Sequence, residues 1–272
     1  MRPVKHLYEV IRERASAWRG AHYPCADHPA IGEILEFAVL PETDHLRFLR
    51  RPQLRALETY WYLRLVEGSL RIPDLYARYF PRATERLAAL GVPVQDERVT
   101  GILIDGGGPD ALLQRIVADN DFAKGLKLES LRETLTLDYP SYIFALAMGA
   151  GKTILIGAII ATEFAMALEY PEGPFVQNAL VFAPGKTILE ALKELADVPF
   201  DRILPPRLYK DFAASLKLTF TRDGEKDLPV VRGSAFNAIV TNTEKIRIQK
   251  PTLRRVQGWT QVELKERERA TQ

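Results

Sequence analysis

The residues best suited to chemistry lie between Ala147 and Thr153, where the sequence reads AMGAGKT. Two glycines in this stretch allow the backbone to curl so that successive N–H groups point at phosphate oxygens. Lys152 would bring a positive charge to the β- and γ-phosphates, and Thr153 would bring a hydroxyl to Mg²⁺. These features predict a site for ATP and Mg²⁺ formed by Gly149, Ala150, Gly151, Lys152 and Thr153.

The elements on either side of this loop must position it. Residues 142–148 form an apolar run of strand length, and residues 154–170 predict a helix that is apolar on nearly every side and therefore buried. A strand–loop–helix context favours a phosphate loop over the alternative, a plain glycine turn. The match covers the second half of the general pattern, because Leu146 stands where that pattern has its first glycine.

The rest of the chain divides into a helical and an α/β part. Residues 1–140 predict mostly helices, with one short strand at 99–105. Downstream of the loop, further strands are expected within 178–184, 216–224 and 235–246, with an amphipathic helix at 186–198. Strands that alternate with helices predict an α/β fold with a parallel sheet covered on both faces. We therefore expect a helical region at 1–140, an α/β domain at 141–250 and a charged tail at 251–272.

Three stretches, in this order, resemble motifs of superfamily 2 helicases. Ala147–Thr153 resembles motif I, Leu180–Leu195 resembles motif Ia, and Ala238–Ile246 resembles the strand end before the acidic ATPase motif. The chain is most similar to the DEAD/DEAH-box helicases of the type III restriction enzyme Res-subunit kind. This resemblance implies a partial RecA-like P-loop NTPase domain from an ATP-dependent DNA helicase or translocase, with duplex DNA and restriction-modification or other DNA-processing subunits as partners.

The resemblance also implies roles for residues outside the loop. Enzymes of this superfamily often carry an upstream glutamine that reads adenine, and Gln53 with Ala56 fits that context, although it lies unusually far before the loop. An insertion would then separate the two. The alternative for Gln53 is a solvated residue at a helix start. The resemblance places DNA-backbone contacts in two turns, at Pro184, Gly185, Lys186 and Thr187, and at Thr241, Thr243 and Lys245.

One required element is not found in the sequence. Hydrolysis in this superfamily needs an apolar strand that ends in Asp-Glu, and nothing after Thr153 fits. We therefore assign no catalytic residue and expect the N-terminal part of a longer enzyme that binds nucleotide weakly, turns it over poorly and exposes an apolar sheet edge. The alternatives are another P-loop ATPase, or a non-catalytic module that binds nucleotide or DNA.

Composition narrows the class of protein without naming a partner. The 272 residues are 47% hydrophobic and 26% charged, which excludes a disordered or fibrous chain. The net charge of +2 gives no global sign of a nucleic-acid or membrane partner. The apolar region 141–168 is interrupted by the glycine loop and Lys152, so it predicts no membrane span. With a single cysteine, Cys25, the chain is expected to be cytoplasmic.

Overall fold

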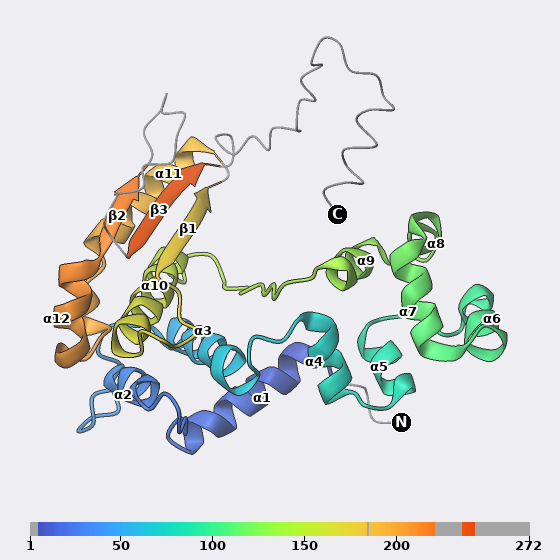
Figure 1. Cartoon of the computed structure of the whole chain (residues 1–272), viewed down its shortest axis with the longest axis horizontal. Helices are drawn as coiled ribbons and strands as arrows, with labels where there is room; N and C mark the ends of the chain where they lie inside the picture. Colours follow the sequence, from blue (N-terminus) through green and yellow to red (C-terminus); the bar gives the residue numbers. More distant parts are fainter. Residues whose placement is uncertain (1–4, 184, 221–235, 243–272) are drawn as a thin grey trace, which may run out of the picture.

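The computed structural model describes residues 5–183, 185–220 and 236–242 of the chain. Figure 1 shows a body that holds α1–α3, the sheet and α10–α12, and a separate group of helices, α5–α9, beyond α4. The helices are α1 (Leu7–Gly20), α2 (Ala30–Phe37), α3 (Arg51–Trp61), α4 (Ile72–Tyr79), α5 (Ala83–Ala89), α6 (Glu97–Asp105), α7 (Gly108–Ala118), α8 (Asn120–Gly125), α9 (Glu129–Thr136), α10 (Lys152–Glu169), α11 (Lys186–Leu192) and α12 (Pro206–Ser215). The strands are β1 (Asn178–Ala183), β2 (Lys217–Phe220) and β3 (Asn237–Asn242).

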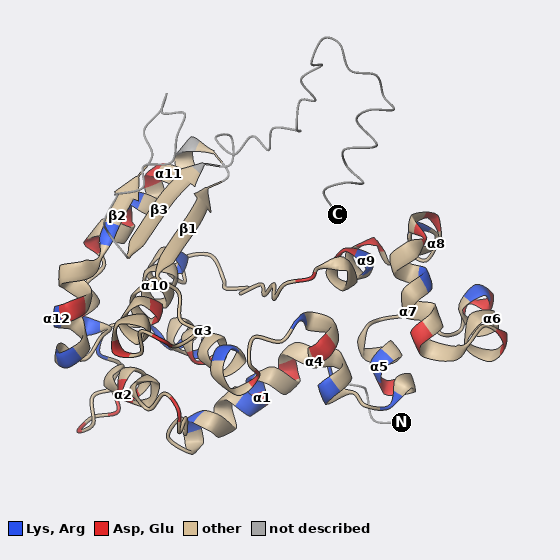
Figure 2. Ribbon diagram, viewed as in Figure 1, with Lys and Arg blue, Asp and Glu red and all other residues tan. Residues whose placement is uncertain are grey.

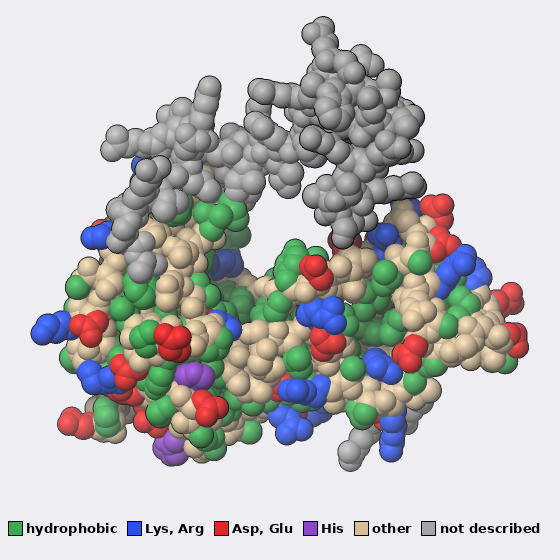
Figure 3. All heavy atoms as spheres, in the orientation of Figure 1, with side chains coloured by type: hydrophobic (Ala, Val, Ile, Leu, Met, Phe, Trp, Pro, Cys, Tyr) green, Lys and Arg blue, Asp and Glu red, His purple; other side chains and the backbone are tan. Residues whose placement is uncertain are grey.

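The three described strands form one parallel sheet in the order β1-β3-β2. Asn237 of β3 is level with Asn178 on one side and Lys217 on the other. The predicted α/β class and parallel pairing are therefore confirmed. Coverage of the sheet is uneven, because Leu180 and Phe182 of β1 are 45% and 44% exposed. Figure 3 shows hydrophobic side chains reaching the surface over the sheet.

Two predicted strands are not strands. Residues 141–147 lie outside any strand and run from α9 to the glycine loop, and Ile143 is 94% exposed. An apolar run predicts burial, but a strand also needs a hydrogen-bonded neighbour, and the described strands pair only with one another. The stretch expected as a strand at 99–105 belongs to helix α6. Asp96 begins that helix by accepting a hydrogen bond from the Arg98 backbone N–H at 3.0 Å.

Helix α10 is buried as its sequence predicts. Its mostly uncharged ribbon is visible in Figure 2, and Ala161 and Phe164 are fully buried. It belongs to the main apolar core, which also includes residues from α1–α3, the sheet and α12. Helices α5–α9 enclose a second, smaller core formed by Leu87, Val92, Val99, Leu112, Ile116, Ala123, Leu126 and Leu128. Within the described ranges, no helix has the length and apolarity needed to cross a membrane.

Two buried glutamates in the helical region have opposite pKa shifts. Burial raises the pKa of Glu58 above its ordinary value of 4.5, although the Tyr23 hydroxyl and Arg19 both hydrogen-bond to it at 2.7 Å. Burial also acts on Glu67, but hydrogen bonds from Tyr79, Tyr62 and Arg78 outweigh it and hold its pKa below 4.5. The two carboxyl groups therefore contribute to stability with opposite pH dependence.

We expect E67Q and E58Q to change the pH profile of stability in opposite ways. Ionised Glu67 stabilises the fold above pH 4.5, and this contribution is lost as pH falls toward its lower folded-state pKa, so E67Q lowers the unfolding temperature at neutral pH. The stability contributed by protonated Glu58 is fully present below pH 4.5 and is lost as pH rises through its raised folded-state pKa. E58Q cannot ionise, so its stability should not fall in this way as pH rises. Thermal unfolding followed by circular dichroism from about pH 2 to about pH 8 measures both. Parallel profiles for the two variants would contradict this assignment.

Candidate functional site

The glycine loop has the backbone conformation that its sequence predicts. Gly149 and Gly151 lie in the left-handed region, with φ of 74° and 76°. The Ala150 N–H donates to the Ala147 carbonyl at 3.2 Å, which closes a turn between them. Helix α10 begins directly after it, at Lys152, as expected. The Lys152 Nζ lies 3.4 Å from the same Ala147 carbonyl, so the cation folds back over the loop.

The start of α10 leaves backbone donors at the loop. The first turn of the helix is closed by the Leu155 N–H, which donates to the Gly151 carbonyl at 3.2 Å. The N–H groups of residues 152–154 have no carbonyl acceptor among the described residues. Unpaired N–H groups at a helix N-terminus, next to a lysine, suit the oxygens of a phosphate group.

Gln53 lies against this loop, although it is 98 positions away from Gly151 in the sequence. Its Nε2 donates to the Gly151 carbonyl at 2.9 Å, and its Oε1 accepts from the Arg50 backbone N–H at 2.7 Å. The side chain is 1% exposed. The structure therefore brings Gln53 and the glycine loop together, with both ends of the amide bound to backbone. In this arrangement Gln53 supports the loop, and its buried amide is not free to hydrogen-bond to an adenine base.

Arg50 is a second residue at the loop, and the sequence reasoning missed it. Its Nη1 donates to the Gly149 carbonyl at 3.0 Å, and the residue is exposed. Arg50 precedes α3 and Gln53 occupies the first turn of that helix, so one helix start holds both loop glycines. The spacing of three residues between them predicts only a helix start, because Gln53 accepts from the Arg50 backbone N–H as the second residue of a capping box does.

Thr153, whose hydroxyl is predicted to reach magnesium, lies beside the glycine loop. Thr153 lies in the first turn of α10 and is half-buried, and its side chain has no hydrogen-bond partner within the described part of the chain. Over the same residues, no group of three or more His, Cys, Asp or Glu side chains is placed to hold a metal ion.

The residues expected to contact DNA differ in exposure, and some of them lie outside the described residues. Gly185 follows β1 with φ of 104°, and Thr187 is exposed at the start of α11. Thr241 is fully buried in the central strand β3, so its expected side-chain contact with DNA does not fit this structure. Pro184, Thr243, Lys245 and the tail 251–272 lie outside the described residues, as does the side chain of Lys186.

We expect G151A to destabilise the protein more than G149A. Both glycines have nearly the same positive φ, so alanine costs about 1–2 kcal/mol of strain at either position. A Cβ at Gly149 meets nothing within 4 Å, whereas one at Gly151 lies 2.3 Å from Gln53 Nε2 and breaks its hydrogen bond. That break adds about 1 kcal/mol for G151A alone.

Urea unfolding of the two variants and of Q53A/G151A measures the difference. The double variant should recover part of the extra loss, because removing the Gln53 amide leaves room for the new methyl group. Equal destabilisation by G149A and G151A would show that Gln53 does not contact the loop in solution.

No protein-family model, no curated protein and no solved structure matches the chain. The function is therefore argued from the residues of the loop and their geometry. The observations that matter most are the two left-handed glycines, the open N–H groups of α10, and the pair of side chains that hold the loop from α3.

Proposed function

We propose that this chain binds ATP with Mg²⁺ at the glycine loop, as the N-terminal part of an ATP-dependent DNA helicase or translocase of the Res-subunit kind. The observation that carries the proposal is the hydrogen bond from Gln53 to the Gly151 carbonyl. It joins the two sequence stretches that resemble nucleotide-binding motifs, across 98 positions of chain. A plain glycine turn gives no reason for a buried glutamine from a distant helix to meet it.

Each part of the loop has a distinct role in this proposal. The N–H groups of residues 152–154 bind phosphate oxygens, and the Lys152 ammonium moves from the Ala147 carbonyl onto the β- and γ-phosphates. Thr153 offers its hydroxyl to the magnesium ion that accompanies ATP. That ion neutralises phosphate charge and orients the triphosphate. Arg50 and Gln53 keep the two glycine carbonyls turned away from the phosphates.

Two further candidate functions share this site. A module that binds nucleotide without turnover is one alternative, because the sequence after Thr153 has no apolar run that ends in Asp-Glu. Another kind of P-loop ATPase would use the same loop and lack the DNA contacts. Nucleotide and DNA binding measured on the same protein separate the helicase proposal from these functions, since only it expects both ligands to bind, with DNA at the turn after β1.

We expect the wild-type chain to bind Mg-ADP saturably in a calorimetric titration, and K152A to abolish this binding. Lys152 is the first residue of α10, where the open N–H groups lie, so its loss removes a main attraction for the diphosphate. Lys210, exposed on α12 and remote in sequence from the loop, provides the control variant K210A, which should bind like the wild type. Equal binding by K152A and the wild type would refute a phosphate site at this loop.

We expect T187E to weaken binding of duplex DNA, measured by fluorescence anisotropy. Thr187 is exposed at the turn after β1, and a glutamate there would repel the phosphate backbone. The same charge on the exposed residue Ala213 of α12, in A213E, is the control and should have a smaller effect. The difference should shrink as salt is raised, because the contact is electrostatic. Identical affinities for the two variants would remove this turn from the DNA site.

A further inference from the structure

Helix α3 packs along α10, and side chains join the two helices at both ends. At the loop end, Arg50 and Gln53 contact the carbonyls of Gly149 and Gly151. At the far end, the Trp61 indole N–H donates to Thr162 Oγ1 at 3.0 Å. Because residue numbers rise along both helices from the first set of contacts to the second, the two helices run in the same direction.

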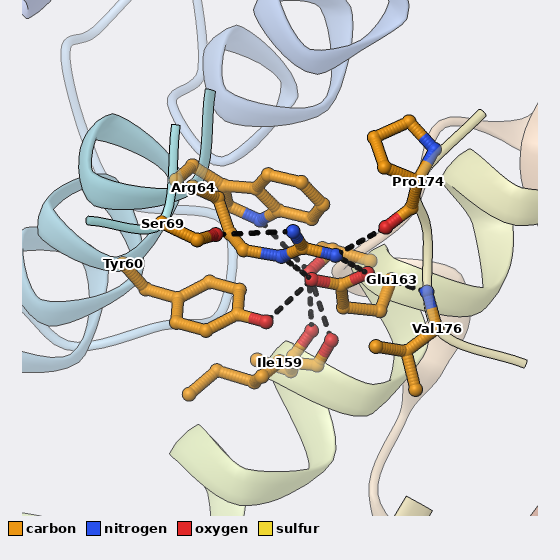
Figure 4. A network of polar contacts seen from close by, with 10 residues as sticks. Tyr60, Arg64, Ser69, Ile159, Glu163, Pro174 and Val176 are labelled. Atoms are coloured by element: carbon orange, nitrogen blue, oxygen red, sulfur yellow. Dashed lines mark hydrogen bonds and ion pairs between the residues drawn. The ribbon is translucent and has the colours of Figure 1, made fainter. Parts of the chain in front are cut away.

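The far end holds a buried ion pair, shown in Figure 4. Arg64 Nε donates to Glu163 Oε1 at 2.8 Å, and the Tyr60 hydroxyl donates to the same carboxylate oxygen. The Val176 backbone N–H donates to Glu163 Oε2 at 2.9 Å. The Glu163 side chain is 3% exposed. Each of these partners donates to the carboxylate, and they come from two stretches of chain, the end of α3 with the turn that continues it and the segment before β1.

Arg64 completes this junction from a widened turn. It lies in the π-helical turn Tyr62–Val66 that continues α3, and such turns often occur at functional sites. Its Nη2 also donates to the Pro174 carbonyl at 2.6 Å, in the segment that leads into β1. The Arg64 side chain thus fixes the end of α3 against α10 and against the approach to the sheet.

An ion pair of this kind restricts how the helices can slide. Apolar side chains tolerate small shifts along a helix, whereas a forked guanidinium–carboxylate contact has few acceptable geometries. Interiors are tightly packed, so a shift at the far end of α3 would reach its first turn, where Arg50 and Gln53 meet the loop. The register of α3 on α10 therefore determines whether these two residues meet the glycine carbonyls.

We propose that Arg64 and Glu163 are positioning residues for the phosphate loop, which set the register of α3 on α10 and so keep the loop open for nucleotide. They act through Arg50 and Gln53 and do not touch the nucleotide themselves. The inference rests on the proposed function for its effect on binding, but its effect on the loop can be measured without any nucleotide.

A second buried pair in the same region provides a matched control. Arg78 donates to Glu67 at 2.7 Å, and the Glu67 side chain is also 3% exposed and accepts from tyrosine hydroxyls. These partners lie on the π turn and α4, and within the described residues none lies on α10 or at the loop. E163Q and E67Q thus remove the same charge from similar surroundings, and only E163Q disturbs the α3–α10 contact.

The experiment measures two properties of the wild type, E163Q and E67Q. Calorimetry with Mg-ADP should show about tenfold weaker binding for E163Q, because its new amide N–H groups face donors and shift α3. E67Q should change affinity by less than about twofold, because the described partners of Glu67 do not lie on α10 or at the loop. Hydrogen exchange without nucleotide should be faster over residues 147–157 in E163Q than in E67Q or the wild type.

R64K keeps the positive charge but not the forked guanidinium, so it should be intermediate in both measurements. If E163Q does not fold, the test uses R64K instead.

The outcomes separate this inference from the proposed function. Wild-type-like affinity and loop exchange in both E163Q and R64K would overturn the positioning role, as would equal losses in E163Q and E67Q. If the wild type fails to bind Mg-ADP, the proposed function fails. The hydrogen-exchange data would then still test the positioning role of Arg64 and Glu163. Faster loop exchange in E163Q alone supports that role, and unchanged exchange overturns it.

Discussion

The arrangement of this protein depends on a buried amide that holds a glycine carbonyl. Gln53 donates to Gly151 and accepts from the Arg50 backbone, so a single side chain orders both the start of α3 and the start of α10. The contact requires Gly151 to lack a Cβ, since that atom would lie 2.3 Å from the amide nitrogen. The glycine is therefore required by the conformation of the loop and also by the approach of its neighbour.

The rest of the body keeps these two helices together. Trp61 and Arg64 reach the second half of α10, and the same junction includes the backbone that leads into β1. The contacts at the glycine loop and this junction thus fasten α3 to α10 at two separate places, and the junction is a buried polar network beside an otherwise apolar core. Such a network has few alternatives once it is buried, because each missing partner leaves a charge or a donor unsatisfied.

The helices α5–α9 form a second unit with its own apolar core. They occupy the chain between the end of α4 and the stretch that leads to the glycine loop, where the sequence comparison of motifs expected an insertion. Their presence explains how Gln53 and Gly151 can be distant in sequence and adjacent in space. The chain leaves α3 at the C-terminal end of that helix and builds this unit. It then returns to the N-terminal end of α3, where the glycine loop lies.

The sequence by itself determined the local features. Glycine spacing indicated the left-handed turn before α10, apolar periodicity indicated most helices, and short apolar runs indicated the three strands of the parallel sheet. It did not determine the secondary structure of residues 99–105 or 142–148, because an apolar run indicates burial but does not specify a strand partner. Only the tertiary structure decided that Arg50 and Gln53 hold the loop and that Arg64 meets Glu163. These contacts join residues about a hundred positions apart, where local preferences carry no information and the packing of two helices sets the distance.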